Sequence, residues 1–287
     1  MNQTVRIYAA ITTDLVFHAQ KIFNLWPTST VALGRVLTMG AIMSSTYKCN
    51  DFLNIKVCGD GPLGKIVCEA IDGKVRGYVE NPGVALQYND GRINVKDGIG
   101  NGYIEVIKDL HLRAPFSSTS EIISGELAED FTYYFAKSEQ IPSAVGLGVT
   151  LNDDSKVKSS GGFLIQVMPG CKEEYIEKLE NKLNNMKSCT EMISLGYSAE
   201  DIIKEITDGD YQLLETKELK YECNCSKERF SRGLKALGID ELLAILNEDK
   251  KAEITCNFCN KKYLFDEADL NSMIEDLRKK EFLEDKK

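Results

Sequence analysis

The sequence predicts an α+β protein with an N-terminal domain of antiparallel strands and packed helices, a helical linker and a small C-terminal domain. Three observations predict this organisation. Strand-like and helical patterns are mixed over the segment 1–170, only helical patterns follow over 171–220, and two close pairs of cysteines mark the remainder. We therefore place the domain boundaries at 1–170, 171–220 and 221–287.

Alternation of polar and apolar residues predicts antiparallel strands in the N-terminal domain. Strand-like runs occur at 53–58, 65–71, 74–79, 84–88, 92–95, 144–151 and 163–167. Asp72-Gly73 lies between the second and third of these runs and favours a tight hairpin turn, because glycine accepts a positive φ. Asn89-Asp90-Gly91 repeats this turn signal, and so predicts a second hairpin between 84–88 and 92–95.

Two helices are expected among these strands. Thr28-Ser29-Thr30 can cap a helix whose apolar positions extend over 31–43 at helical spacing. Ser118 and Glu121 fit a capping box ahead of a second helix with its apolar positions over 122–135. Strands and helices together supply enough apolar residues for this domain to fold alone.

The segment 171–220 follows a break at Pro169-Gly170 and shows helical patterns only. Its apolar stripes are Tyr175, Ile176, Leu179, Leu183 and Met186, then Met192, Ile193 and Leu195, then Ile202, Ile203 and Ile206. Helices this short and this charged are seldom stable alone, so they must lie on another surface. We interpret the segment as a helical linker.

Composition excludes several classes of function. The 287 residues carry 35 basic and 44 acidic side chains, a net charge of −9, which opposes binding to bare phosphate backbones. No apolar run is long enough to cross a bilayer. The N-terminal segment 1–17 alternates polar and apolar side chains and places Arg6 inside the run, unlike a signal peptide. We therefore expect a cytoplasmic protein that binds neither nucleic acid nor membranes.

The C-terminal segment 221–287 contains a candidate metal site. Cys223-Asn224-Cys225 forms one close pair, and Cys256-Asn257-Phe258-Cys259 forms the other. Four thiolates satisfy the tetrahedral preference of zinc, and each close pair can present two sulfurs from one turn. The segment is rich in charge, with 15 acidic and 13 basic side chains, so it has little apolar surface and needs a metal to fold. In a reducing compartment this pattern indicates zinc rather than static disulfides.

The simplest interpretation of four cysteine ligands is a closed structural site, but two features indicate redox chemistry as well. Cations lie near the ligands in sequence and favour the thiolate form: Lys227, Arg229, Arg232, Lys261 and Lys262. Each pair can also form a disulfide, and disulfide sulfur is a poor zinc ligand. Structural zinc contributes an apparent ~10–16 kcal/mol to folding of a small domain, so oxidation is expected to unfold this segment.

Other motifs are better explained by packing than by chemistry. Residues 59–64 match Gly-x-Gly-x-x-Gly, but a strand rather than a helix follows, so we expect a hairpin and no nucleotide site. Residues 234–246 resemble a helix-turn-helix, but Asp240-Glu241 would repel DNA. His18 and His111 lie in no catalytic motif, and we expect no enzyme activity. The remaining cysteines, expected to be buried and inert, are Cys49, Cys58, Cys68, Cys171 and Cys189.

With its four paired cysteines, the chain resembles the heat shock protein 33 family of chaperonins, which are redox-regulated holdases. The resemblance covers essentially the whole chain. Besides the cysteine motifs, the similar segments are 32–35 (ALGR), 59–64 (GDGPLG), 77–82 (GYVENP), 124–130 (SGELAED), 161–166 (GGFLIQ) and 230–232 (FSR). All four cysteines are present in the family's order.

The resemblance implies a specific function. The reduced form would hold one zinc ion per chain at Cys223, Cys225, Cys256 and Cys259 and would be inactive. Oxidative stress, often with heat, would form Cys223–Cys225 and Cys256–Cys259 disulfides, release zinc and unfold the C-terminal domain and linker. The exposed apolar surface would then bind unfolding proteins without ATP and prevent their aggregation, commonly in a homodimer.

Two other classes of function compete with this one. A static zinc ribbon that docks a partner would lose its function with its zinc, whereas the chaperone should gain activity on oxidation. A zinc hydrolase would need an open coordination position, which four cysteine ligands do not leave. The stripes between Tyr175 and Ile206 are the natural candidates for client binding.

Overall fold

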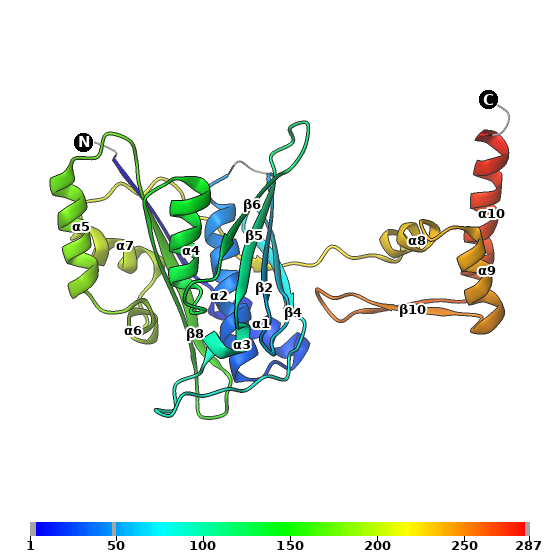
Figure 1. Cartoon of the computed structure of the whole chain (residues 1–287), viewed down its shortest axis with the longest axis horizontal. Helices are drawn as coiled ribbons and strands as arrows, with labels where there is room; N and C mark the ends of the chain where they lie inside the picture. The colour runs from blue at the N-terminus through cyan, green and yellow to red at the C-terminus, as the bar shows by residue number, and fades with distance from the viewer. Residues whose placement is uncertain (1–3, 48–49, 285–287) are drawn as a thin grey trace. The chain divides into compact units, whose positions relative to one another are not determined.

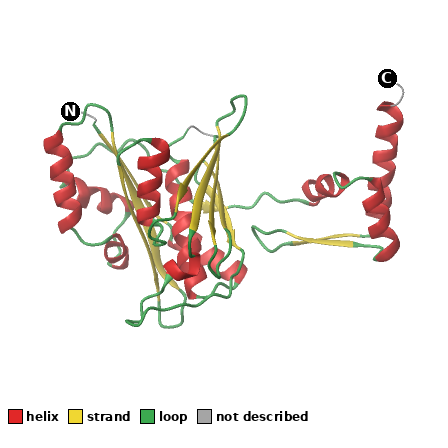
Figure 2. Ribbon diagram, viewed as in Figure 1, coloured by secondary structure: helices red, strands yellow, loops and turns green. Residues whose placement is uncertain are grey.

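The computed structural model describes residues 4–47 and 50–284 and has the predicted α+β fold (Figure 1). It divides into two compact units between Glu222 and Cys223. The described strands form two sheets in the first unit and a hairpin in the second, with helices packed around them (Figure 2). Within the described ranges, every helix is too short or too polar to cross a membrane.

A three-stranded antiparallel sheet lies on one side of the first unit. Its strands are β1 (Val5–Ile11), β7 (Ser143–Leu151) and β8 (Val157–Val167), in the order β1-β8-β7. Just after β1, the Thr12 hydroxyl lies 2.6 Å from that of Thr38 and 2.9 Å from that of Ser160. These buried hydroxyls satisfy one another and join the sheet to the helix that carries Thr38.

A six-stranded sheet lies on the other side. Its strands are β2 (Phe52–Gly59), β3 (Ile66–Ile71), β4 (Lys74–Val79), β5 (Gly102–Asp109), β6 (Phe116–Glu121) and β9 (Lys220–Tyr221), in the order β6-β5-β2-β3-β4-β9. All neighbours are antiparallel except β4 and β9. Ile71 pairs with Lys74 across Asp72-Gly73, where both turn residues have a positive φ, so the predicted hairpin is confirmed.

Helices between the sheets complete the core of the first unit. They are α1 (Thr13–Phe23), α2 (Pro27–Ser44), α3 (Val95–Ile99), α4 (Ala128–Tyr134) and a π-helical turn η1 (Phe135–Glu139). Helix α2 contacts strands of both sheets, and nearly all of its side chains are buried. A helix that is buried on nearly every side belongs in such a central position.

Helices α5 (Glu173–Asn185), α6 (Cys189–Ser194) and α7 (Ala199–Thr207) cover the other face of the three-stranded sheet (Figure 1). Met192, Ile193, Ile202 and Ile206 pack there against Phe163 and Ile165 of β8. Helix α5 has no buried residue and contacts α7. The apolar stripes predicted for this segment therefore lie on another surface, except for Tyr175 and Leu195, which are exposed.

The second unit has a small core of its own. Its elements are α8 (Lys227–Lys235), α9 (Ile239–Glu248), β10 (Ala252–Thr255), β11 (Lys262–Phe265) and α10 (Glu267–Glu284). Strands β10 and β11 form an antiparallel hairpin. The buried residues are Leu234, Leu242, Cys256, Tyr263, Phe265, Leu270, Met273 and Ile274. The helix pair around Gly238 is confirmed as a packing unit, with Gly238 at a positive φ.

The second hairpin predicted at 84–95 is only partly correct: the turn at 89–91 forms, with Tyr88 N–H donating to Arg92 O at 2.8 Å, but the described residues beside it form no regular strands. The structure has one isolated bridge, between Gln87 and Ile93, and residue 95 already begins α3. The backbone of this segment instead serves the start of α2: Thr28 N–H donates to Val84 O, and Leu86 N–H donates to the Thr28 hydroxyl at 2.8 Å. Helix α2 also begins at Pro27, before the predicted Thr-Ser-Thr cap, because proline suits the first helical turn.

The capping box predicted at Ser118 and Glu121 is also wrong, because both residues lie in strand β6. Ser118 pairs there with Val106 of β5. The helix begins later, at Ala128, and the Asp130 carboxylate accepts the backbone N–H groups of Ile123 and Leu127, each at 2.8 Å. Pairing with a neighbouring strand outweighs the local capping pattern here.

Candidate metal centre

The four paired cysteines come from two places in the second unit. Cys223 and Cys225 precede α8, whose first turn is capped by Ser226: its hydroxyl accepts the Arg229 N–H at 3.2 Å. Cys256 and Cys259 lie in the turn between β10 and β11. The Ser226 cap fixes the backbone just after Cys223 and Cys225, and the β10–β11 turn holds Cys256 and Cys259.

Backbone hydrogen bonds shape the hairpin turn around Cys256. The Cys256 N–H donates to Lys261 O at 3.0 Å, and Cys256 O accepts the N–H groups of Cys259 and Asn260 at 3.3 and 2.8 Å. Asn260 has a positive φ of 56°, which asparagine tolerates better than most residues. Such a turn places both sulfurs of a Cys-x-x-Cys pair on one side.

The sulfur atoms of all four cysteines lie within 4.8 Å of one another. The Sγ atoms of Cys223 and Cys256 are 3.7 Å apart, and those of Cys225 and Cys259 are 3.3 Å apart. A tetrahedron with zinc–sulfur bonds of about 2.3 Å has edges of about 3.8 Å, close to these distances. The four sulfurs therefore fit a tetrahedral metal ion without rearrangement of the backbone.

Cys225 differs from its neighbours in its protonation. Burial opposes its ionisation, but hydrogen bonds from Tyr263 and from the other three thiols outweigh burial and lower its pKa to about 7. Burial raises the pKa of Cys256 and of Cys259. The cluster thus has one thiol that ionises readily and two that resist ionisation in the absence of a metal.

Tyr263 is a functional residue that sequence reasoning missed. It lies on β11, and its hydroxyl is 3.1 Å from the Cys225 sulfur and 3.0 Å from the Cys225 carbonyl oxygen. Its ring packs against Phe230 at 5.0 Å. The hydrogen bond to Cys225 raises the pKa of Tyr263, so the hydroxyl remains a donor. Only the alternation in β11, which directs residue 263 inward, could have indicated it.

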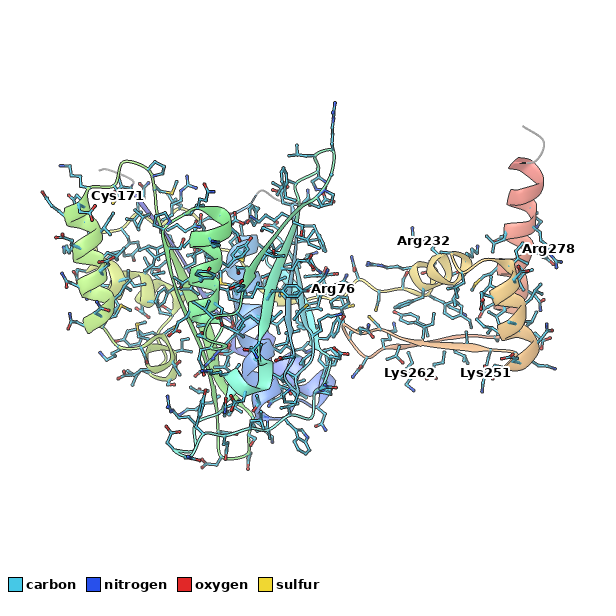
Figure 3. The ribbon with its side chains drawn as sticks, in the orientation of Figure 1. Arg76, Cys171, Arg232, Lys251, Lys262 and Arg278 are labelled. Carbon is cyan, nitrogen blue, oxygen red and sulfur yellow. The ribbon has the colours of Figure 1, made fainter. Side chains whose placement is uncertain are left out.

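The predicted role of nearby cations is not supported at Cys225, whose pKa is lowered by other groups. Lys227 pairs with Asp269 at 2.6 Å and Lys262 with Glu253 at 2.7 Å, so these charges are already compensated. Arg229 donates to the Asn224 side chain at 3.1 Å. Arg232 and Lys262 lie on the surface of the second unit (Figure 3). The groups that lower the pKa of Cys225 are instead Tyr263 and the neighbouring thiols.

The burial predicted for the lone cysteines is only partly correct. Cys68 and Cys189 are buried, and burial raises the pKa of both, for Cys189 to about 12. Cys58 and Cys171 are half-buried, the latter just ahead of α5 (Figure 3). Cys58 is in the outward-facing set of β2, which the strand alternation could have indicated. Cys49 lies outside the described residues.

Other sequence candidates have structural roles. Residues 59–64 join antiparallel strands β2 and β3, so the predicted glycine hairpin is confirmed. A Cβ atom at Gly59 would lie 2.0 Å from Ile99 O, which explains the glycine there by close backbone approach. His18 packs on Tyr221 with ring centroids 5.1 Å apart, and His111 Nε2 is 2.9 Å from Asn50 O.

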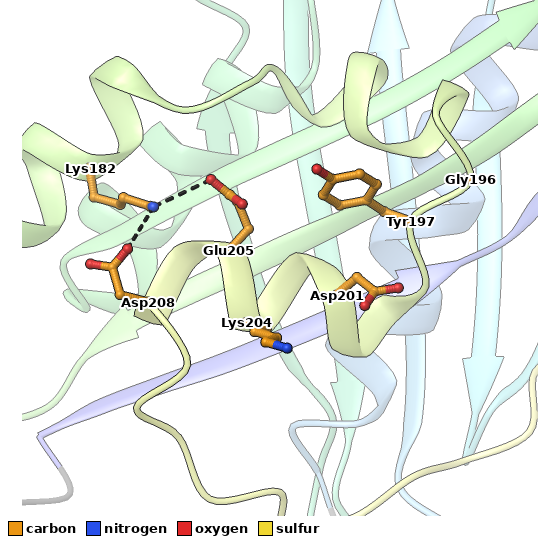
Figure 4. Close-up of a pocket in the computed structure, with 7 residues that line it drawn as sticks. All are labelled: Lys182, Gly196, Tyr197, Asp201, Lys204, Glu205 and Asp208. Atoms are coloured by element: carbon orange, nitrogen blue, oxygen red, sulfur yellow. Dashed lines mark hydrogen bonds and ion pairs between the residues drawn. The ribbon is translucent and has the colours of Figure 1, made fainter.

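A polar pocket lies among α5, α7 and the turn before α7 (Figure 4). Its lining residues are Lys182, Gly196, Tyr197, Asp201, Lys204, Glu205 and Asp208. Lys182 is 3.3 Å from Glu205 and 2.7 Å from Asp208, so the charges in this pocket pair with one another. These ion pairs hold α5 against α7 and indicate no chemistry.

Comparison with known proteins places these features in a family context. The family model described as "Hsp33 protein" matches residues 1–266. The 33 kDa chaperonin of Staphylococcus carnosus is 46% identical over 277 residues, covering 95% of this chain and 94% of the relative. The 33 kDa chaperonin of Bacillus licheniformis is 42% identical over 276 residues, covering 95% and 96%. The crystal structure of the 33 kDa chaperonin from Thermotoga maritima is 33% identical, with a TM-score of 0.88 over 96% of this chain and 95% of that one.

Proposed function

Because the chain belongs to the Hsp33 family of chaperones, we propose that it acts as a redox-regulated holdase that needs no ATP. The reduced protein holds one zinc ion per chain and is inactive. Oxidation of its four clustered cysteines unfolds the second unit and exposes apolar surface for unfolding clients. The observation that carries this proposal is the convergence of four sulfurs within 4.8 Å in a unit with a very small core.

Cys223, Cys225, Cys256 and Cys259 are the residues that would hold zinc. Bound zinc would cross-link the start of the second unit to the β10–β11 turn. Cys256 belongs both to the cysteine cluster and to the buried core of this unit. A change at the cluster therefore acts directly on the core.

Oxidation converts the ligands into disulfides, which we assign as Cys223–Cys225 and Cys256–Cys259 from the family resemblance. In each pair, two thiolate ligands give up two electrons, which together with two protons from the solvent reduce one molecule of hydrogen peroxide to two of water, and the zinc ion leaves once its ligands are oxidised. Cys225 ionises most readily in the metal-free cluster, where its pKa is about 7, and a thiolate is the form that attacks an oxidant. Disulfide sulfur no longer holds the metal, and the small core is insufficient to keep the unit folded.

The client-binding surface is expected under α6 and α7. Their apolar side chains and those of β8 form a buried cluster that includes Phe163, Met192 and Ile202. Release of these helices exposes both halves of the cluster to unfolding proteins. We propose further that the oxidised form is a homodimer, that the protein is cytoplasmic, and that it catalyses no reaction. The hairpin formed by residues 59–64, where a phosphate loop would need a helix, supports independence from ATP.

The test follows zinc and activity together in the full chain. The reduced, zinc-loaded protein is treated with hydrogen peroxide at mildly raised temperature, zinc release is read with a chromogenic chelator, and suppression of aggregation is read by light scattering of a thermally unfolding protein. We expect zinc release and activity to rise together. Zinc release without activity would support the alternative, a static ribbon that docks a partner.

Matched cysteine variants separate the cluster from the remaining thiols. Cys259→Ser removes a candidate ligand, and we expect weak zinc retention and activity without an oxidant. Cys171→Ser removes a half-buried thiol outside the cluster, and we expect normal zinc content and a normal response. If Cys171→Ser abolished the response while Cys259→Ser left it intact, the assignment of the switch to this cluster would be wrong.

A further inference from the structure

The segment 217–222 covers one edge of the six-stranded sheet, directly ahead of Cys223. Lys220 and Tyr221 pair in parallel with Lys74 and Val75 of β4. The Lys220 N–H donates to Gly73 O at 3.0 Å, and the Glu222 N–H donates to Val75 O at 3.1 Å. These bonds involve main-chain atoms only, so the edge of β4 recognises an extended backbone.

The side chain of Tyr221 extends this pairing further along β4. Its hydroxyl donates to Gly77 O at 2.8 Å and accepts the Gly77 N–H at 3.4 Å. Backbone groups that point to one side of a strand belong to alternate residues, here Gly73, Val75 and Gly77. Segment 217–222 thus bonds to the outward polar groups of Gly73, Val75 and Gly77, which an edge strand otherwise exposes.

Alternate side chains of the segment point into the protein. Lys217, Leu219 and Tyr221 are partly buried, whereas Glu218, Lys220 and Glu222 are exposed. Leu219 and Tyr221 pack against the main core of the first unit. The edge of β4 therefore offers main-chain hydrogen bonds together with two apolar contacts at alternate positions, the pattern by which sheet edges bind added strands.

The ion pairs of the segment add little to its attachment. The ion pairs at its ends, Lys217 with Asp72 at 2.7 Å and Lys74 with Glu222 at 2.8 Å, are partly or largely exposed. Exposed ion pairs contribute little to stability, and a strand as short as β9 is marginal by itself. Close approach at Gly73, where a Cβ atom would lie 2.6 Å from Glu218 O, shows that the site is shaped for a backbone.

We propose that the outer edge of β4 is a strand-addition site for extended segments of unfolding client proteins, and that residues 217–222 occupy it until the second unit unfolds. This inference rests on the proposed function and specifies part of its binding surface. Recognition through main-chain atoms is independent of sequence, which suits client proteins that have no sequence in common. The two apolar contacts favour segments with apolar residues at alternate positions, such as strands exposed from client cores.

Amide hydrogen exchange of the full chain, resolved by residue with NMR, tests the site. The probe is reduced, carboxymethylated α-lactalbumin, which stays unfolded. We expect the amides of Val75 and Gly77 to be protected in the reduced zinc-loaded form, to exchange rapidly after oxidation, and to regain protection with the probe. Continued protection after oxidation, or no regained protection with the probe bound, would overturn the proposal.

A peptide pair separates backbone recognition from apolar contact. One short peptide carries apolar residues at alternate positions, and its control carries the same side chains with N-methyl groups on alternate backbone amides. We expect N-methylation to weaken binding to the oxidised chain by about tenfold or more, because several main-chain hydrogen bonds are lost. Equal binding of both peptides would overturn strand addition. Amide protection of Val75 and Gly77 that rises with protein concentration in the absence of a client would also overturn the proposal, because the occupant would then be a second copy of the chain.

Tyr221→Phe tests the segment without disturbing the sheet, with Tyr211→Phe as its control. The Tyr211 hydroxyl donates to Glu200 at 2.6 Å, away from β4. We expect the Gly77 amide of reduced Tyr221→Phe to exchange about three- to tenfold faster, and that of Tyr211→Phe to be unchanged. Equal exchange rates of the Gly77 amide in the two variants would contradict the protection of this amide that is assigned to the Tyr221 hydroxyl. Loss of aggregation suppression by the oxidised wild-type chain would instead contradict the proposed function itself.

Discussion

The Tyr263 hydroxyl distinguishes Cys225 from the other cysteines of the cluster. It donates to the Cys225 sulfur at 3.1 Å and comes from the same strand that closes the hairpin behind Cys256 and Cys259. Hydrogen bonds to a thiolate stabilise the charged form, and residues that contact metal ligands in this way tune metal affinity. Tyr263 is therefore a positioning residue of the candidate metal centre.

Tyr263→Phe is expected to lower zinc affinity by about 10- to 100-fold, the usual effect of removing such a partner. Competition with a chelator of known affinity measures the change. Tyr88→Phe is the control, because its hydroxyl bonds to Glu126 at 3.0 Å in the first unit. Equal zinc affinity in Tyr263→Phe and the wild-type chain would show that the hydroxyl has no influence on the metal.

The effect of Tyr263→Phe is also expected to depend on pH. Without its hydrogen bond, the pKa of Cys225 should move from about 7 toward its ordinary value of 9.0. Zinc must displace the proton from a thiol, so the variant should lose more affinity at a pH near or below 7 than above 9, where the thiol is ionised in both proteins. Zinc competition measured across this range provides the comparison. A loss that is independent of pH would assign the role of Tyr263 to packing.

At the scale of elements, strands and helices with a strong repeat could be predicted, and those that depend on distant partners could not. The β3–β4 hairpin follows from Asp72-Gly73 alone, and the cysteine cluster follows from spacing alone. Strand β6 could not be distinguished from a capping box, because its pairing with β5 decides its conformation. Residues 84–95 carried a turn signal but bond to the start of α2. Tyr263 was missed because its role depends on two strands meeting two distant cysteines.

Alanine substitutions at two glycines are expected to change the stability of their units in opposite directions. A Cβ atom at Gly59 would meet backbone atoms of Ile99, so Gly59→Ala should destabilise the first unit by about 1–3 kcal/mol. Gly233 lies inside α8 with nothing within 4 Å of the added atom, so Gly233→Ala should stabilise the second unit by about 0.5–1 kcal/mol. Thermal unfolding of the zinc-loaded chain measures whether each variant is stabilised or destabilised. A stabilising Gly59→Ala or a destabilising Gly233→Ala would contradict the packing described.

At the scale of the whole molecule, the two units differ in how much of their stability comes from apolar burial. The first has an extensive core around α2, whereas the second has a short set of buried residues that includes a candidate ligand, Cys256. Burial scales with size, so we expect the second unit to be the one that depends on a metal. The two units should therefore respond separately to the same treatment.

Removal of zinc by a chelator under reducing conditions should unfold the second unit and leave the first intact. Far-ultraviolet circular dichroism should lose the signal of α8, α9 and α10, while amides in β2 and β5 stay protected from exchange. A second unit that stayed folded without zinc would contradict its dependence on the metal. Loss of protection in β2 would show that the first unit relies on the second.

Under the proposed function, the burial of Cys68 affects how accurately the chain would return from the oxidised state. A Cβ atom at Gly40 would lie 2.4 Å from the Cys68 sulfur, so this thiol is enclosed between α2 and the sheet. Four reactive cysteines can form two disulfides in three different ways. Each further pair of reactive cysteines multiplies the number of incorrect pairings. While α2 and the sheet stay folded, enclosure keeps Cys68 out of this exchange, whereas the proposed release of α6 would expose Cys189. Under the proposed function, the melting temperature of the first unit therefore sets the upper limit at which Cys68 stays out of the exchange, although the proposed oxidation occurs in the second unit.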